Sequence, residues 1–441
     1  MPAFADALAY WFKLGWISFG GPAGQIAMMH AELVERRRWI SEGRFLHALN
    51  YCMVLPGPEA QQLATYIGWL MHGTRGGIAA GALFVLPSLF ILIALSWTYV
   101  RFGHTPIVSA ILYGIKPAVV AIVLAAAFRI GARALKHPSM WAIAIAAFIA
   151  VHGMKWPFPV VVLAAAVAGA LLGRLLPQSI GQGAGAHAAK APADQADYLI
   201  GDADAPPAHA SFRLVHTLIV IAVFVVIWWL VIAILSNVLG GETGTAAQLA
   251  WFHTKAALLT FGGAYAVLPY VYQAAVDQYH WLSAAQMIDG LALGETTPGP
   301  LIMIVAYVGF MAGWSKQLLG VDLPALGGML GAVIATFFTF LPSFLFILAG
   351  APFIEGTRHQ LQLKGPLTGI TAAVVGVIVS LAVFFAEQVF FLAAPGIDWL
   401  AVAIALAALI ALVRWRRGVI ETLLVAAAIG AAVRLLPPVL A

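Results

Sequence analysis

Two short glycine and proline motifs interrupt apolar segments of this chain, and each motif occurs twice. Phe19-Gly20-Gly21 recurs as Phe261-Gly262-Gly263, and Pro56-Gly57-Pro58 recurs as Pro298-Gly299-Pro300. A break in an apolar helix frees backbone groups, which are tolerated at membrane depth only where protein or a water-filled cavity satisfies them. Helices that restart after each break would point N–H groups and positive dipole ends into that cavity, which suits a negatively charged ligand. The breaks therefore predict an anion site, although each motif alone is also typical of a kink or close helix packing.

Three lysines lie inside apolar segments. Lys13 and Lys255 each precede a Phe-Gly-Gly motif by six residues, and Lys116 has Thr371 as its counterpart in the second half. Because a charge inside a membrane is energetically unfavourable, such lysines are candidates for binding an anionic substrate. The alternative for Lys13 and Lys255 is that their long side chains reach out to the membrane surface.

Two carboxylates and several neutral donors flank the Pro-Gly-Pro motifs. Glu59 directly follows the first motif and Glu295 precedes the second by three residues, so each is a candidate proton carrier or counter-ion. For Glu59 the alternative is stabilisation of a helix N-terminus. Glutamine and threonine side chains beside the breaks either bind oxyanion oxygens or satisfy backbone groups. The residues expected to bind the substrate are Lys13, Gly20, Gly21, Gln25, Gly57, Gln61, Gln62, Lys116, Lys255, Gly262, Gly263, Thr296, Thr297 and Gly299.

The sequence has no motif typical of a hydrolase, a metalloprotease or a nucleotide-binding protein. The sequence contains no Gly-x-Ser-x-Gly elbow, no His-Glu-x-x-His and no Walker phosphate loop, which argues against an enzyme or an ATP-driven pump. Its single cysteine, Cys52, excludes an internal disulfide, and its histidines have no metal-ligand spacing. We expect no metal, no cofactor and no nucleic-acid partner. The N-terminal stretch has no basic region followed by a cleavage site, so we expect the first apolar segment to belong to the mature fold.

The composition defines the fold class. The 441 residues are 62% hydrophobic and only 9% charged, with a mean hydropathy of +0.95, whereas soluble domains carry about 25% charged residues. Apolar runs such as 77–100 and 214–235 are long enough to cross a bilayer as helices. The net charge of +5 resides mainly in short loops, as positive-inside bias produces. We predict an all-α polytopic membrane protein.

The chain also contains an internal repeat. The two Phe-Gly-Gly motifs are 261 − 19 = 242 residues apart, and Trp39 aligns with Trp281 at the same shift. Further on, Leu86-Pro87-Ser88 matches Leu341-Pro342-Ser343 at a shift of 341 − 86 = 255, so the second half contains an insertion of 255 − 242 = 13 residues. We predict a repeat at 1–176, a flexible aqueous linker at 177–211, a connecting transmembrane helix at 212–240, and a second repeat at 241–441.

Loop charges indicate that the second repeat is inverted. The loop Glu35–Arg44 of the first half is basic, whereas its counterpart in the second half, Asp277–Gln286, has no Lys or Arg. Conversely, the loop Arg414–Arg417 of the second half is basic, whereas its counterpart in the first half has only Lys155. Opposite bias in equivalent loops is what an extra crossing between inverted repeats produces. The N-terminus and the linker are then cytoplasmic. The broken segments either cross the membrane, giving thirteen spans, or are re-entrant, giving nine.

The motifs resemble those of long-chain chromate ion transporters. The resemblance is carried by Phe19-Gly20-Gly21-Pro22, Trp39-Ile40-Ser41, the run 55–68, Gly114–Val119, and in the second half by Phe261-Gly262-Gly263, Trp281 and Gly294–Ile302. It covers both repeats and implies export of chromate across the bacterial inner membrane and chromate resistance, with sulfate as the physiological look-alike. It supplies no settled binding site, so the residues named above remain a physical inference.

Three functions stay open at this point. The first is chromate efflux by alternating access, driven by the membrane potential or a proton gradient. The second is transport of another oxyanion or a small organic anion on the same scaffold. The third is a membrane-embedded scaffold or enzyme, against which the duplicated broken helices argue. A homodimer is the commonest oligomeric state of such proteins and is the one we expect.

Overall fold

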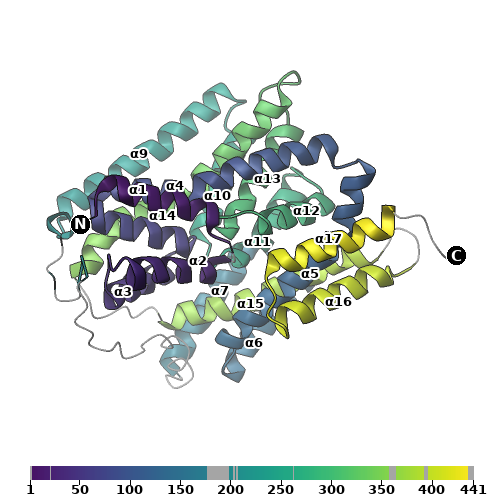
Figure 1. Ribbon diagram of the computed structural model, residues 1–441, viewed down its shortest axis with the longest axis horizontal. Coiled ribbons are helices and arrows are strands. Elements are labelled where there is room, and N and C mark those ends of the chain that lie inside the picture. Colours follow the sequence, from purple (N-terminus) through teal and green to yellow (C-terminus); the bar gives the residue numbers. More distant parts are fainter. Residues whose placement is uncertain are drawn as a thin grey trace.

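The computed structural model describes residues 2–19, 21–175, 198–201, 204, 207–261, 263–356, 364–391 and 396–435. Within these ranges the chain is helical, and one isolated bridge, Phe391 to Ile397, is its only strand-like pairing (Figure 1). The first half contains α1 (Phe4–Ile17), α2 (Gly21–His30), η1 (Ala31–Arg36), α3 (Glu42–Val54), α4 (Glu59–Phe102), α5 (Pro106–Ala134), α6 (Pro138–Phe148), η2 (Ile149–Gly153) and α7 (Phe158–Leu175).

The second half repeats this order after a short 3-10 turn and one long helix. These two elements are η3 (Ala208–Ala210) and α9 (Leu214–Val238). The rest of the chain contains α10 (Thr245–Leu258), α11 (Ala264–Tyr272), η4 (Gln273–Gln278), α12 (Ala284–Glu295), η5 (Leu301–Met303), α13 (Ile304–Ser315), α14 (Pro324–Gly356), α15 (Lys364–Phe390), α16 (Trp399–Val413) and α17 (Val419–Leu435).

Five helices of the described part are long and apolar enough to cross a bilayer. They are α4, α5, α9, the Pro324–Glu355 part of α14 and the Pro366–Phe390 part of α15. Apolar side chains of α9 such as Leu218, Val226 and Leu230 are more than half exposed, which is expected of a helix that faces lipid. The prediction of an all-α membrane protein is confirmed.

The local structure of the two halves repeats with the sequence. The π-helical segments η1 and η4 begin 273 − 31 = 242 residues apart. Positive φ angles recur at the same shift, at Gly57 (126°) and Gly299 (99°), and at Arg38 (52°) and His280 (51°). A non-glycine residue with positive φ is uncommon, so its recurrence at one shift reflects the duplication and not chance.

Each repeat contains a helical hairpin. In α4 the non-helical angles of His72 and Gly73 turn the chain back, and we name residues 59–72 and 73–102 its first and second arms. Gly68 of the first arm lies against Gly76 of the second. In the second half, α13 and α14 form the corresponding pair, with Gly313 lying against Gly327 and Gly309 against Gly331.

Helices of each repeat pack against helices of the other repeat. On the right of Figure 1, α5 packs against α16 and α17, and in the equivalent contacts α15 packs against α6 and α7. Two of the close approaches are equivalent too: a Cβ at Gly114 would lie 1.9 Å from the carbonyl oxygen of Ala426, and one at Gly369 would lie 2.3 Å from that of Ala165. Only glycine permits such contact between helix backbones. The halves therefore form one interlocked body.

The described end of the predicted linker is held against the first half by backbone hydrogen bonds. Backbone N–H groups of Leu199 and Ile200 donate to the carbonyls of Arg38 (3.0 Å) and Trp39 (3.2 Å). Ile200 is only 3% exposed. Composition alone could not reveal this, because backbone pairing with residues 38–41 orders the segment. Residues 176–197, which hold most of the predicted linker, lie outside the described residues.

Candidate functional site

The four breaks meet in two reciprocal contacts. The N–H of Gly57 in the first Pro-Gly-Pro motif donates to the carbonyl of Thr260 at 2.7 Å. The N–H of Gly299 in the second motif donates to the carbonyl of Ser18 at 2.9 Å. The donors are 299 − 57 = 242 residues apart and the acceptors 260 − 18 = 242 apart, so each half makes the same contact to the other. The contacts between the two halves are therefore reciprocal.

Two serines complete this arrangement. A Cβ on Gly57 would lie 2.6 Å from Oγ of Ser343, and a Cβ on Gly299 would lie 2.8 Å from Cβ of Ser88. Ser88 and Ser343 belong to the repeated Leu-Pro-Ser motif and are 343 − 88 = 255 residues apart. We call Ser18, Gly57, Ser88, Thr260, Gly299 and Ser343 together the crossing.

The chain enters and leaves the crossing on the same side, because α3 and the first arm of α4 run in opposite directions beside α14. α3 runs along α14, since His47 contacts the carbonyl of Ile354 at 3.3 Å and Tyr51 donates to that of Phe346 at 2.9 Å. After the break at Gly57, the first arm of α4 runs back along the same helix, and its Tyr66 donates to Glu355 at 2.5 Å. In the second half α12 and α13 form the same in-and-out pair, as Ser315 donates to the carbonyl of Trp281 at 2.8 Å.

Three glutamines of the first half are fully buried beside the breaks, and two of them, Gln25 and Gln62, donate hydrogen bonds to groups of the crossing. The amide nitrogen of Gln25 donates to the carbonyls of Gly299 (2.6 Å) and Ser18 (3.2 Å), and that of Gln62 donates to the carbonyl of Pro56 (2.8 Å). Gln61 lies alongside and donates to Thr65 at 3.0 Å. The amide oxygens of the three glutamines have no hydrogen-bond partner. Their counterparts in the second half are Val267, Met303 and Ile304, so the polar lining is one-sided.

The predicted threonines bond to their own helix. The hydroxyls of Thr296 and Thr297 donate to the carbonyls of Leu293 and Gly294, both at 2.9 Å. At the crossing, the described hydroxyls without a partner are instead those of Ser18 and Ser88, which are fully buried. The prediction missed these serines. The repeated Leu-Pro-Ser motif was the available signal for Ser88.

Helices begin at the predicted breaks. α2 starts at Gly21 and α4 at Glu59, while α11 and η5 follow Gly263 and Pro300. Among these, the N-cap positions Pro58, Gly263 and Pro300 provide no side-chain cap, so the first-turn N–H groups keep their capacity to bind an anion. The predicted residues Gly20 and Gly262 lie outside the described residues.

The lysines divide into two groups. Lys13 and Lys255 have exposed side chains on the outer faces of α1 and α10, so the structure does not bring them to the crossing. Lys116 instead forms an ion pair with Asp289 of α12, with 3.3 Å between Nζ and Oδ1. The hydroxyl of Tyr99 donates to the other oxygen of this buried carboxylate at 2.9 Å. Asp289 was missed, although a lone acid in an apolar segment is itself a signal.

The two predicted acids lie at the edges of the breaks. Glu59 is the first residue of α4 and is partly exposed. Glu295, at the end of α12, is also partly exposed and accepts a hydrogen bond of 2.6 Å from Tyr265. Arg129 of α5 interacts electrostatically with both members of that pair. Both carboxylates therefore adjoin the crossing along the chain, Glu59 two residues after Gly57 and Glu295 four residues before Gly299.

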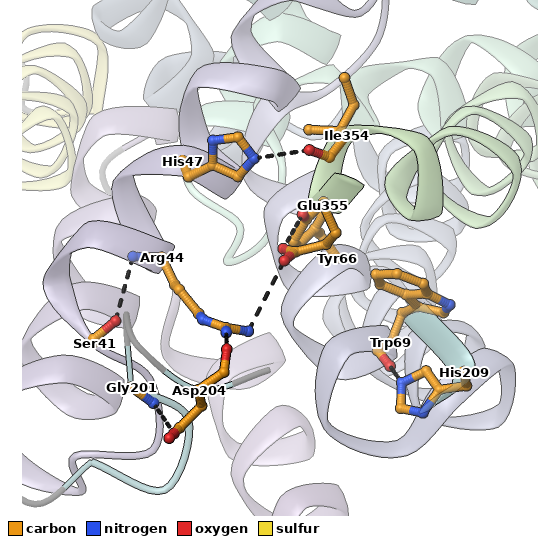
Figure 2. A network of polar contacts seen from close by, with 10 residues as sticks. All are labelled: Ser41, Arg44, His47, Tyr66, Trp69, Gly201, Asp204, His209, Ile354 and Glu355. Atoms are coloured by element: carbon orange, nitrogen blue, oxygen red, sulfur yellow. Dashed lines mark hydrogen bonds and ion pairs between the residues drawn. The ribbon is translucent and has the colours of Figure 1, made fainter. Parts of the chain in front are cut away.

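A second polar network lies where α3 meets the end of α14 (Figure 2). Arg44 forms an ion pair with Glu355, with 3.9 Å between the charged atoms, and each residue is 3% exposed. The guanidinium also donates to the carbonyl of Asp204, which belongs to the ordered end of the linker. His209 of the same segment contacts the carbonyl of Trp69 at 2.9 Å. The linker thus covers a buried charge pair that joins the two halves.

Broken helices thus meet at a buried polar crossing inside a bundle of apolar helices, an architecture typical of membrane transport proteins. A model of the family described as "Chromate transporter" matches two segments, residues 5–170 and 247–432. The chain belongs to this chromate transporter family, and it is a multi-pass transport protein and not an enzyme.

Curated relatives support this assignment. The chromate transport protein of Pseudomonas aeruginosa is 33% identical over 397 residues, which cover 88% of this chain and 83% of that protein. The chromate transport protein of Cupriavidus metallidurans is 27% identical over 384 residues, covering 86% and 82%. A probable chromate transport protein of Synechococcus elongatus is 26% identical over 381 residues, covering 86% and 84%. No solved structure matches the chain.

Proposed function

We propose that this protein exports chromate from the cytoplasm by alternating access to a single site at the crossing. The observation that carries the proposal is the pair of reciprocal hydrogen bonds, Gly57 to Thr260 and Gly299 to Ser18. They bring breaks from both halves to one buried point, where a change in the relative position of the halves alters access. The similarity to chromate transport proteins supplies the substrate class.

The chemistry around the crossing suits a tetrahedral dianion, which offers only hydrogen-bond acceptors. The hydroxyls of Ser18 and Ser88 are free to donate, and uncapped helix starts add backbone N–H groups and positive dipole ends. The glutamine amides become further donors when substrate displaces their backbone partners. Sulfate presents the same acceptors in the same geometry, so sulfate or a small organic anion is the second candidate substrate.

We infer nine membrane crossings with the two repeats inverted. The in-and-out paths of α3 with the first arm of α4, and of α12 with α13, favour re-entrant segments over crossing ones. α9 is then the single extra crossing between the repeats. This arrangement puts Arg36–Arg38, Arg129–Lys136 and Arg414–Arg417 on the side of the N-terminus, which the positive-inside rule makes the cytoplasm. The protein would reside in the bacterial inner membrane, as a homodimer if the common oligomeric state applies.

The membrane potential is sufficient to drive export. With the cytoplasm negative by about 100 mV, outward movement of one negative charge is favourable by about 2.3 kcal/mol, so a dianion gains about 4.6 kcal/mol. That free energy sustains a gradient of roughly a thousandfold or more. A proton could be coupled through Glu59 or Glu295, whose partly exposed carboxylates flank the crossing.

The test is uptake of chromate by everted membrane vesicles under an imposed, inside-positive potential. We expect the wild type to accumulate chromate without ATP and the Ser88→Ala variant to accumulate roughly tenfold less, the loss of about one hydrogen bond to a charged group. Ser96→Ala is the matched control, because Ser96 is buried on the same helix but donates to the carbonyl of Leu92 at 2.6 Å. Uptake of sulfate but not chromate would move the assignment to the second candidate, and equal loss in both serine variants would remove Ser88 from the site.

A further inference from the structure

Two buried polar clusters link the halves at equivalent positions. We name Arg44, His47, Tyr66, Ile354 and Glu355 the inner cluster, because it contacts the linker, and Tyr99, Lys116, Asp289 and Tyr307 the outer cluster. In the inner cluster α3 meets the end of α14, and in the outer cluster α12 meets the end of α4. The contacting residues correspond: 289 − 47 = 242 and 354 − 99 = 255, the two shifts that relate the repeats.

The clusters lie on opposite sides of the crossing. Tyr99 follows Ser88 by 99 − 88 = 11 residues on the second arm of α4, which is about 16 Å of helix. In the other direction, Gly77 precedes Ser88 by 88 − 77 = 11 residues, and it packs beside Thr65, the neighbour of Tyr66. The clusters are therefore about 30 Å apart along α4, close to the thickness of the hydrocarbon core of a bilayer.

Each cluster contains one ion pair that joins the two halves. Arg44 of the first half meets Glu355 of the second, and Lys116 of the first half meets Asp289 of the second. The carboxylates are almost completely buried, with side chains 1% and 4% exposed. Buried ion pairs contribute little net stability compared with apolar packing, and their best-attested use is to fix one arrangement among alternatives. Both pairs are formed in this structure, one on each side of the crossing, so each is placed to hold its own side closed.

We propose that the inner and outer clusters are the two gates of the transport path and that they open alternately. This inference rests on the proposed function and adds its gating residues. A dianion arriving at either gate competes with the carboxylate of one half for the cation of the other, so the substrate itself weakens the contact that blocks it. Arg44 meets the substrate on the linker side and Lys116 on the opposite side. The linker contacts the inner gate as well, because Arg44 donates to the carbonyl of Asp204, and we call this contact the linker strap.

The single cysteine of the chain offers a reporter for the inner gate. Cys52 is fully buried on α3 between His47 of the inner cluster and Gly57 of the crossing. Its equivalent on the outer path is 52 + 242 = 294, where a Cβ on Gly294 would have no neighbour closer than 3.5 Å. Cys52→Ser combined with Gly294→Cys therefore gives a matched reporter for the outer gate.

The experiment measures labelling by a negatively charged, membrane-impermeant thiosulfonate, from outside in spheroplasts and from the cytoplasmic side in everted vesicles. We expect Glu355→Gln to accelerate labelling of Cys52 from the cytoplasmic side at least tenfold and to slow labelling at position 294 from outside. Asp289→Asn should do the reverse. Glu421→Gln is the control, because Glu421 pairs with Arg417 at 3.2 Å on the exposed surface.

Opposite responses of the two reporters distinguish gating from general loosening. Acceleration at both reporters by either variant, or no change at either, would overturn the proposal. Should Glu355→Gln fail to reach the membrane, Glu355→Asp keeps the charge but withdraws the carboxylate from Arg44, and it must shift the two reporters in the same directions as Glu355→Gln. Labelling requires no chromate, so a correct labelling pattern without chromate uptake would reject the substrate and leave the gates standing.

Discussion

The tightest test of the crossing is to add one methyl group to it, with Gly299→Ala. Gly299 has a φ of 99°, and a Cβ there would lie 2.8 Å from Cβ and 3.2 Å from Oγ of Ser88. The left-handed backbone region disfavours a side chain by about 1–2 kcal/mol. Overpacking against a helix adds about 1–3 kcal/mol. We therefore expect the variant to lose about 2–5 kcal/mol of unfolding free energy.

A second glycine separates these two contributions. Gly320 has a similar φ of 86°, but a Cβ there would have no neighbour within 4 Å. Gly320→Ala should lose only the backbone contribution of about 1–2 kcal/mol. The difference between the two alanine variants then measures how tightly the halves are packed at the crossing.

The assay is the unfolding free energy in mixed micelles, together with chromate flux in vesicles. The closest contact of the added methyl group is with Cβ of Ser88, which Ser88→Gly removes. A double-mutant cycle of Gly299→Ala with Ser88→Gly should therefore give a favourable coupling free energy of about 1–3 kcal/mol. Ser88→Ala keeps that atom and removes only the more distant Oγ, so it should recover clearly less. Equal losses at Gly299 and Gly320, or equal rescue by the two serine variants, would refute the reasoning that the breaks are in contact.

Two further predictions use matched pairs. Tyr66→Phe removes the hydrogen bond of 2.5 Å to Glu355 and should reduce the unfolding free energy by about 1.5–3 kcal/mol, whereas Tyr10→Phe, whose buried hydroxyl has no partner, should be neutral or stabilising in the same measurement. Gly114→Ala places a Cβ 1.9 Å from a backbone oxygen of α17 and should abolish folded protein in a thermal-stability assay in detergent. Gly131→Ala, on the same helix with its nearest neighbour at 3.4 Å, should be tolerated, and equal behaviour of the two glycine variants would contradict the packing of α5 against α17.

The sequence identified the positions of the breaks because glycine and proline control backbone conformation locally. Gly57 and Gly299 take positive φ angles where the motifs predicted interruptions, and helices begin at Gly21 and Glu59. Which groups meet across the breaks could not be predicted in this way. The carbonyl of Ser18 is a backbone group of an ordinary residue, and its choice of Gly299 as a partner depends on how the halves pack.

Side-chain direction explains why Lys116 reaches a buried carboxylate and Lys13 does not. On α1 the buried residues Tyr10, Trp11 and Leu14 define the inner face, and Lys13 lies on the opposite one. The pattern of equivalent residues was correct as a repeat, but it carried no information on which face turns inward. Asp289 escaped notice for the converse reason: its counterpart is His47, so a comparison that sought identical residues passed over it.

The reciprocity of the contacts has a mechanistic consequence. If the halves are related by a two-fold axis in the membrane plane, any movement that opens one end has a counterpart that opens the other end with equivalent contacts broken and formed. The two states then differ in free energy only through the residues that break the symmetry, which are the one-sided glutamines, the linker strap and the different charge pairs at Arg44 and Lys116. A small difference of this kind is what a transporter needs, because a ligand shifts an equilibrium only by its differential affinity for the two states. The chemical asymmetry between the repeats is therefore the part of the sequence in which we expect the direction of transport to be encoded.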